Sequence, residues 1–278
     1  VINGDDAVLV SLVKRFRSKI IYFTRTWDNP VVRRHLGCGG SAVLEKAGQI
    51  ILARGQEATF LMDIRNIPAT YGGLAGHNVE NSLAAIAAAV GLGVETADIV
   101  RGLQGFSSNL KLNPGRMNIL TLGDIRLVLD YGHNPMGFSR VIQSLKKLHH
   151  GQLTGVVGMP GDRRDKDIRE AGRILARGLD RMIIKEDGDL RGRRPGEVAD
   201  LLKHSALESG FDPARVTVLP DEAQAAQYAL ETARPGEMIV VFYEKLAKVL
   251  PAIERAVNRD FSPEDRQDFL RHCQNIIS

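Results

Sequence analysis

The chain has 278 residues, 44% of them hydrophobic and 25% charged, a composition typical of a folded globular protein with up to two domains. Its 37 basic and 33 acidic residues leave a formal charge of +4 without a long block of one sign, which argues against a nucleic-acid partner. The longest uncharged apolar run, Leu83 to Val94, is too short to cross a bilayer, and Cys38 and Cys273 have no zinc-ligand spacing. We therefore expect a cytoplasmic protein without a membrane partner and with no metal site within this chain.

The chain starts at Val1 rather than Met and shows no signal peptide, so it is expected to begin after processing or inside a longer protein. Residues 1–6 are an apolar start broken by turn residues, and apolar residues then recur at helical spacing from Val8 to Val13. Either aspartate of the turn would cap that helix.

Short strand-like runs follow, and two of them flank Ala47 and Gly48 as a hairpin. The expected strands are 19–24, 41–44 and 49–53, and the segments 58–62 and 64–67 could add another. Such short, mixed strands predict a covering sheet rather than a second nucleotide-binding fold.

The segment G-H-N-V-E-N, residues 76–81, opens the most helical part of the chain. Asn78 and Asn81 are three residues apart, so both lie on one face at a helix start, where free N–H groups also collect. Helix capping would explain one asparagine, whereas a nucleotide-binding role would use both. A second helix, capped by Thr96 and running to Leu103, is expected next.

A polar, turn-rich segment at 104–113 is expected to link two domains, and it leads into Asn113-Pro114-Gly115-Arg116. An arginine after such a turn is most often solvated. Its planar guanidinium also suits oxyanions, so Arg116 is a candidate ligand for phosphate groups.

The stretch D-Y-G-H-N-P, residues 130–135, lies between an apolar run and a helical pattern, where a strand passes into a helix. In an open α/β sheet this carboxyl edge is where ligands bind. The same residue types also make an ordinary turn, so both interpretations stay open here.

From this stretch onward the pattern becomes regular. Strands are expected at 125–131, 153–158, 182–185, 216–219 and 238–243, alternating with helices at 135–148, 164–179, 195–209, 221–232 and 245–257. Such alternation predicts a mostly parallel, doubly wound sheet.

Two charged loops are expected at strand ends of this sheet. Residues 158–167 balance acids against bases, so a solvated helix start is an alternative to a binding loop. Residues 185–195 have their acids first, from Glu186 to Asp189, and their bases last, from Arg191 to Arg194. An ordinary surface loop need not have this polarity.

The motifs G-H-N-x-x-N, P-G-R, D-Y-G-H-N-P and G-D-R-R-D, in this order, resemble those of the Mur ligase superfamily, whose members are ATP-dependent amide-bond formers. Gly132 stands where the family usually has alanine, a change that adds backbone freedom. Within the superfamily, R-R-H-L-G-C-G-G, G-D-R-R-D, E-D-x-D-L-R-G-R and V-F-Y-E-K resemble the cyanophycin synthetases most. The resemblance covers residues 1–257.

This resemblance implies an α/β fold in which a doubly wound, mostly parallel Rossmann-like domain follows the end portion of a Mur-type central ATPase domain. The implied boundaries are 1–110 for the central-domain portion, 111–258 for the C-terminal domain and 259–278 for a tail with a docking helix at 263–277. V-I-N-G-D-D resembles a family turn that lies downstream of the phosphate loop, and G-x-x-x-x-G-K-[ST] does not occur in these residues. The phosphate loop and the Mg²⁺ ligands are therefore expected upstream of this chain.

The implied activity is that of a carboxylate–amine ligase that works through an acyl phosphate, with ATP and Mg²⁺ as cofactors. Its substrates would be an amino acid and a peptide polymer with acidic and basic side chains. For the nucleotide, the resemblance implies Asn78 and Asn81 near adenine, Arg116 at phosphate, Asp130 at ribose, and His133 and Asn134 beside the closing site. For the substrate, it implies Asp162, Arg163, Arg164, Asp189, Arg191 and Arg193.

His133 is also a candidate general base for the amine, and no catalytic residue is assigned. The chain alone is expected not to hydrolyse ATP. Alternatives are a non-catalytic nucleotide- or polymer-binding truncated paralogue, and a fragment of a cell-wall Mur ligase. The tail is expected to dock on the sheet or on a second subunit, so a homo-oligomer stays open.

Overall fold

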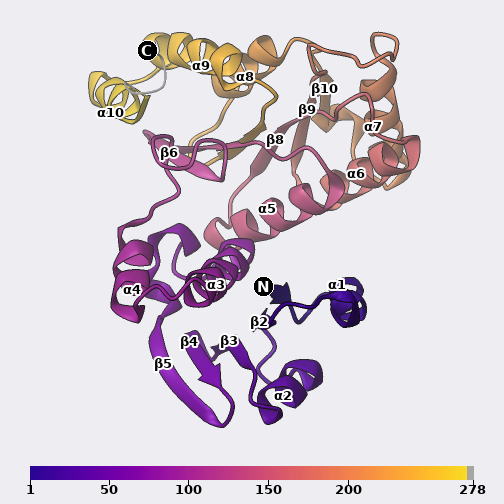
Figure 1. Cartoon of the computed structure of the whole chain (residues 1–278). Coiled ribbons are helices and arrows are strands. Elements are labelled where there is room, and N and C mark those ends of the chain that lie inside the picture. The colour runs from indigo at the N-terminus through magenta and orange to yellow at the C-terminus, as the bar shows by residue number, and fades with distance from the viewer. Residues whose placement is uncertain (274–278) are drawn as a thin grey trace. The chain divides into compact units, whose positions relative to one another are not determined.

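The computed structural model describes residues 1–273, and the chain divides into two compact units, residues 1–107 and the part from Ser108 onward (Figure 1). Each unit is built on its own sheet. Among the described residues, no helix combines the length and the apolar character that a membrane crossing requires.

The first unit has a five-stranded sheet in the order β1-β2-β3-β4-β5. β1, β2 and β3 are parallel, and β3, β4 and β5 are antiparallel neighbours, so the hairpin predicted around Ala47 and Gly48 is confirmed. Ala47 and Gly48, both with positive φ, form the turn between β3 and β4. The strands are β1 (Ile2–Asn3), β2 (Ile21–Thr24), β3 (Ser41–Lys46), β4 (Gln49–Arg54) and β5 (Glu57–Asp63).

Four α-helices and three short 3-10 turns complete the first unit. The helices are α1 (Ala7–Leu12), α2 (Pro30–Gly37), α3 (Gly76–Gly91) and α4 (Thr96–Gly105), and the turns are η1 (Val13–Arg15), η2 (Ile64–Asn66) and η3 (Pro68–Thr70). Asp6 caps α1 by accepting the N–H groups of Val8 and Leu9. The strand considered at 64–67 is wrong, because Asp63 accepts the Arg65 N–H at 2.9 Å and turns the chain into η2.

The second unit has a six-stranded sheet in the order β10-β9-β8-β11-β7-β6. Its neighbours pair in parallel except for β6, which is antiparallel to β7. The strands are β6 (Asn118–Leu122), β7 (Ile125–Asp130), β8 (Leu153–Val157), β9 (Arg181–Ile184), β10 (Val216–Val218) and β11 (Met238–Phe242). Every residue of the central strands β8 and β11 is buried, as strands covered on both faces require.

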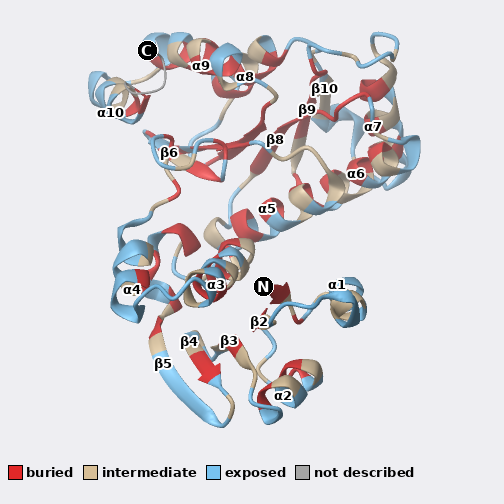
Figure 2. Ribbon diagram, in the orientation of Figure 1, coloured by how far each residue is buried: buried red, intermediate tan, exposed pale blue. Residues whose placement is uncertain are grey.

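The helices of the second unit lie on both faces of this sheet, and the predicted doubly wound architecture is confirmed (Figure 1). α5, α6 and α7 pack side by side on one face, and α8 packs against α9 on the other. In Figure 2 these helices carry buried residues among exposed ones, as helices that are covered on one side do. The helices are α5 (Pro135–Leu148), α6 (Asp165–Gly178), α7 (Glu197–Glu208), α8 (Glu222–Glu231), α9 (Leu246–Asp260) and α10 (Pro263–Cys273), with a 3-10 turn η4 (Pro213–Arg215).

α10 packs against β6 and α9, with Phe269 and Cys273 buried. The last part of the helix expected at 263–277 lies outside the described residues.

The strand order creates a crevice beside β11. The loop after β11 leads to α9 on one face, whereas the loops after its neighbours β7 and β8 lead to α5 and α6 on the other face. Connections that leave in opposite directions open a space at the carboxyl ends of the strands, and this is the usual ligand site of doubly wound sheets.

Candidate functional site

Asp130 is the last residue of β7 and lies at this carboxyl edge, yet only 5% of it is exposed. Its Oδ2 accepts the Met117 N–H at 2.8 Å. Burial raises the pKa of Asp130 to about 6, although hydrogen bonds from the Met117 and Gly132 amides and the charges of Arg116 and His133 act to lower it. Asp130 therefore binds the backbone of the P-G-R segment.

The P-G-R segment and the D-Y-G-H-N-P segment form one cluster in the second unit. The Tyr131 N–H donates to the Gly115 carbonyl at 2.8 Å. Asn118 accepts the Gly115 N–H at 2.7 Å and donates to the Asn113 carbonyl at 2.9 Å. The Arg116 side chain is exposed, with its guanidinium carbon 5.9 Å from the centre of the Tyr131 ring. We call residues 113–117 the Arg116 turn.

His133 and Asn134 complete the segment after β7. His133 donates from Nδ1 to the Tyr131 carbonyl at 3.0 Å, and the two rings lie 5.2 Å apart. Asn134 caps α5, because its Oδ1 accepts the Gly137 N–H at 2.8 Å and Pro135 takes the first helical position. The structure thus brings four of the six predicted nucleotide residues to one strand end.

The other two, Asn78 and Asn81, lie at the start of α3 in the first unit. Asn78 is buried and donates to the Ala69 carbonyl at 2.7 Å, and Asn81 donates to the Asn78 Oδ1 at 3.4 Å. Neither asparagine caps α3, whose N-cap residue is Ala75. The simple capping explanation is therefore wrong, while Asn78 anchors the helix start to the preceding turn.

A cavity of about 180 Å³ lies at the carboxyl ends of β7, β8, β9 and β11. We call it the strand-end cavity. Its lining combines cationic and anionic side chains from separate loops with aromatic rings of the D-Y-G-H-N-P segment and β11. The ionisable lining residues from the later loops are Arg163, Lys185, Asp187, Arg191 and Glu244, and His133 lines the side next to β7.

A buried ion network forms one wall of this cavity. Lys185 is 2% exposed, and its Nζ lies 2.7 Å from Asp187 Oδ1 and 3.0 Å from Glu222 Oε1. Glu222 also accepts the backbone N–H groups of Glu244 and Lys245. The network therefore fixes the loop after β9 against the loop after β11.

The polarity expected for the loop at 185–195 needs correction. Glu186 is buried and accepts the Gly196 N–H at 2.8 Å, next to the start of α7, while Asp187 is buried in the Lys185 network. The first two acids of this loop are thus engaged inside the unit and do not form a surface charge.

The six predicted substrate residues fall into different environments. Arg193, with 15% of its side chain exposed, donates to the carbonyls of Gly161 and Arg163 and pairs with Asp165 and Glu197, so it ties the two charged loops together.

Asp162 pairs with Arg191 at 2.7 Å across the two loops. Arg163 Nε is buried and lies 3.9 Å from Asp162, beyond hydrogen-bonding distance. Asp189 accepts the Arg191 N–H at 2.9 Å. Arg164, the residue just before α6, pairs with Asp167 in the first turn of that helix. Of the six, only Arg163 and Arg191 line the strand-end cavity.

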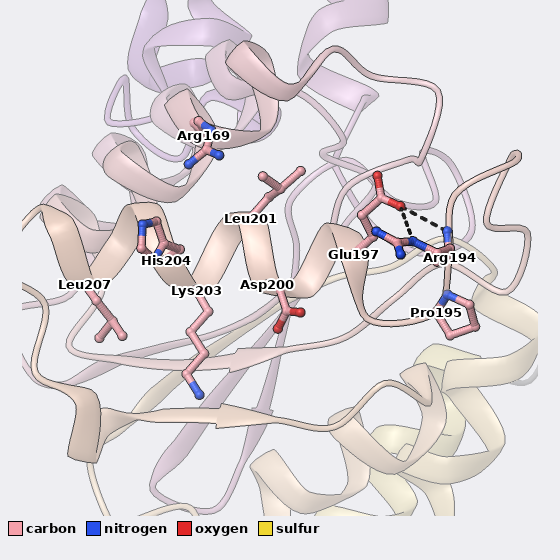
Figure 3. Close-up of a pocket in the computed structure, with 9 residues that line it drawn as sticks. All are labelled: Arg169, Arg194, Pro195, Glu197, Asp200, Leu201, Lys203, His204 and Leu207. Carbon is pink, nitrogen blue, oxygen red and sulfur yellow. Dashed lines mark hydrogen bonds and ion pairs between the residues drawn. The ribbon is translucent and has the colours of Figure 1, made fainter.

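A larger hollow of about 700 Å³ lies along α7, with Arg169 of α6 on its opposite side (Figure 3). Figure 3 shows Glu197 bound to Arg194 at one end, while Lys203 and His204 line its middle. None of the predicted site residues lines this hollow. We place the candidate site in the strand-end cavity, because polar groups from four strand ends converge there.

Asn118, Lys185, Glu222 and Tyr243 were not predicted as site residues. A lysine directly after the apolar run M-I-I of β9 was an available signal, because a charge at that edge of a parallel sheet faces the crevice. Glu222 follows an aspartate that caps α8, so its sequence context indicates only a helix start.

The second unit is a doubly wound α/β domain, and residues 115–242 match the family profile described as Mur ligase, glutamate ligase domain. This match confirms the resemblance to the Mur ligase superfamily, and the second unit belongs to its C-terminal domain family. Cyanophycin synthetase of Crocosphaera subtropica is a relative that is 37% identical over 255 residues. The alignment covers 92% of this chain and 29% of that protein, so the chain spans less than a third of the relative's length.

Two solved structures show the same fold at low identity. A murein peptide ligase from Psychrobacter arcticus is 17% identical with a TM-score of 0.55, and the match covers 91% of this chain and 54% of that one. FolC of E. coli in complex with DHPP and ADP is 19% identical with a TM-score of 0.53, covering 81% and 50%.

Proposed function

We propose that this chain is part of an ATP-dependent carboxylate–amine ligase that extends a peptide polymer by an amino acid. The polymer's terminal carboxylate would be phosphorylated by ATP, the amine would attack the acyl carbonyl, and phosphate would leave. The relationship to cyanophycin synthetase supports this reaction class. We also propose that the polymer carries acidic and basic side chains and that the protein is cytoplasmic.

The observation that carries the proposal is the mixed charge of the strand-end cavity. A free amino acid has a carboxylate and an ammonium group. Arg163 and Arg191 bring guanidinium groups that suit a carboxylate, Arg191 being paired with Asp162 in this structure. Glu244 brings a carboxylate to the same cavity, and the Asp187 carboxylate in its wall is paired with Lys185. We assign the incoming amino acid to this cavity, with Arg163 and Arg191 at its carboxylate.

For the nucleotide, the proposal assigns Arg116 of the second unit to the phosphates and Asp130 of the same unit to the ribose. It assigns Asn78 and Asn81 of the first unit to adenine. Phosphoryl transfer relies on positive groups and Mg²⁺ that stabilise dispersed charge. Among the residues assigned to the nucleotide, Arg116 is the positive group. The Mg²⁺ ligands and the phosphate loop are assigned to parts of the protein outside these 278 residues. His133 lines the strand-end cavity and is the candidate that would take a proton from the amine.

The test uses the full-length protein and measures ATP turnover with polymer primer and with aspartate or arginine as the added amino acid. Arg191→Ala and Arg163→Ala should each raise the KM for the amino acid about tenfold, the loss expected for one charged hydrogen bond. The KM for ATP should stay unchanged. The matched control is Arg194→Ala, since Arg194 is 91% exposed and does not line the cavity.

An unchanged KM for the amino acid in both variants would contradict the assignment of this cavity. The alternative is a non-catalytic nucleotide- or polymer-binding module. The same assay separates it, because full-length protein without primer-dependent turnover would support that module. A cell-wall ligase is a further alternative. ATP turnover with a nucleotide-linked peptide instead of the polymer would support it.

A further inference from the structure

The Arg116 turn is fixed on both sides by buried polar side chains. On the N-terminal side, Asn118, which is 1% exposed, accepts the Gly115 N–H at 2.7 Å and donates to the Asn113 carbonyl at 2.9 Å. On the C-terminal side, Asp130 accepts the Met117 N–H at 2.8 Å. The backbone before and after Arg116 is thereby attached to β6 and to β7.

Further contacts hold the peptide groups between these two attachments. The Tyr131 N–H donates to the Gly115 carbonyl at 2.8 Å, and the Ser108 hydroxyl donates to the Arg116 carbonyl. A Cβ on Gly115 would lie 2.1 Å from the Tyr243 hydroxyl oxygen, so the turn also packs closely against the end of β11.

The backbone conformation shows that these contacts impose a shape on the turn. Gly115 has φ +72°, which glycine adopts freely, but Met117 has φ +52°, a left-handed conformation that a side chain disfavours. Met117 is the residue whose N–H binds Asp130, and its side chain is completely buried. A strained residue persists only where its surroundings over-determine it.

The Arg116 guanidinium is not held in place by hydrogen bonds as the Arg116 backbone is. Within residues 1–273 it makes no hydrogen bond or ion pair, and it extends beside the Tyr131 ring. A fixed backbone with an available cation lowers the ordering cost of binding an anion.

We propose that Asn118 and Asp130 are positioning residues that hold the Arg116 turn so that the guanidinium is directed at a phosphate-bearing ligand. The identity of the ligand as ATP rests on the proposed function, whereas the rigidity of the turn does not. Through the Arg116 turn, Asp130 would act on the phosphate end of the ligand, in addition to the ribose contact assigned to it in the proposed function.

The first experiment measures trypsin cleavage of the Arg116–Met117 bond in this chain by mass spectrometry. Asn118→Leu and Asp130→Leu should each raise the cleavage rate by about tenfold or more, because each leaves a buried amide without its acceptor. Asp130→Asn keeps an oxygen that accepts the Met117 N–H, so it should cleave at nearly the wild-type rate. Cleavage at Lys203 in α7 reports general unfolding, and the rate at Arg116 is taken relative to it.

The matched control is Leu120→Ala, which removes a buried side chain from β6 without touching the turn. It should lower stability but leave the cleavage ratio unchanged. A ratio that rises equally in Leu120→Ala, or does not rise in Asn118→Leu and Asp130→Leu, would overturn the positioning role.

The second experiment measures the KM for ATP in the full-length protein. Asn118→Leu should raise this KM as Arg116→Ala does, while the KM for the amino acid stays unchanged. If trypsin finds the turn loosened but the KM for ATP is unchanged, the phosphate role of Arg116 is refuted and the positioning of its backbone stands. The two results therefore separate this inference from the proposed function.

Discussion

At the scale of single residues, two aspartates are shifted in opposite directions by their surroundings. Burial raises the pKa of Asp130 to about 6, while the hydrogen bond from the Arg65 side chain lowers the pKa of the partly exposed Asp63 to about 2. Both start from the same ordinary value of 3.8, so the difference between them reports their environments.

We predict that the side-chain carboxyl carbons of these two residues titrate in separate pH ranges in one NMR experiment. Asp130 should have its midpoint near 6 and Asp63 its midpoint near 2. Asp63 is the internal control, because it shares the chain and the solvent but not the burial. Overlapping midpoints near 3.8 would show that Asp130 is hydrated and that the Arg116 turn opens.

The sign of the stability effect follows from the raised pKa. Because the folded state binds the Asp130 proton more tightly than the unfolded state does, its contribution is complete below pH 3.8 and is lost as the pH rises through about 6. A shift of this size corresponds to roughly 3 kcal/mol. Asp130→Asn should remove this slope from the free energy of unfolding between these two pH values.

The sequence predicted which residues gather at the end of β7. Asp130 follows an apolar strand, and that position fixes it at the carboxyl edge. The inward direction of Glu186 and Asp187 was not predictable, because their partners Gly196 and Lys185 become relevant only once the loop is folded. Asn118 was missed for the same reason, since its hydrogen bonds depend on the shape of the Arg116 turn.

At the scale of elements, the hairpin between β3 and β4 has a residue that does not suit its conformation. Its two-residue turn has φ +49° at Ala47 and +79° at Gly48, and such turns favour asparagine followed by glycine. Alanine in the left-handed region is disfavoured, whereas asparagine tolerates it.

Ala47→Asn should therefore raise the free energy of unfolding of the first unit by about 1 kcal/mol. The measurement is guanidinium denaturation followed by the fluorescence of Trp27, the single tryptophan of the sequence, which lies in this unit. Ala58→Asn is the matched control, because Ala58 is an exposed strand residue of β5 and should lose stability on the same change. Equal effects at both positions would contradict the strain at Ala47.

The regular elements of the second unit were predictable because their apolar periodicity is strong. β7, β8, β9, β10 and β11 and the helices between them lie within a few residues of the expected positions. β6 was not predicted, although Gly123 and Asp124, which separate it from β7, are a two-residue hairpin signal. In the first unit, a side-chain hydrogen bond of Asp63 decided the local structure where apolar content indicated a strand.

At the scale of the whole molecule, the chain passes between the units through a short exposed segment. Gln104, Gly105 and Phe106 are exposed, and the division between the units falls after Ser107. Exposed connections between compact units are preferred sites of proteolysis.

Brief treatment with chymotrypsin should cut first after Phe106, which is 38% exposed, and release two fragments. Intact-mass spectrometry identifies the cut, and Phe106→Ala should abolish it without changing later cleavages. A first cut inside either unit would show that this unit is less compact than its packing indicates.

The two outer strands of the second sheet differ in how they meet solvent. On one side, α10 packs on β6, and Asp265 accepts the Gly123 N–H at 2.8 Å in the turn that follows this strand. On the other side, β10 is only three residues long, from Val216 to Val218. Open strand edges are templates for pairing with other chains, and covering or shortening them removes the template. Both edges of the sheet are therefore protected against edge-to-edge aggregation. α10 covers the β6 edge, and β10 is too short to serve as a template.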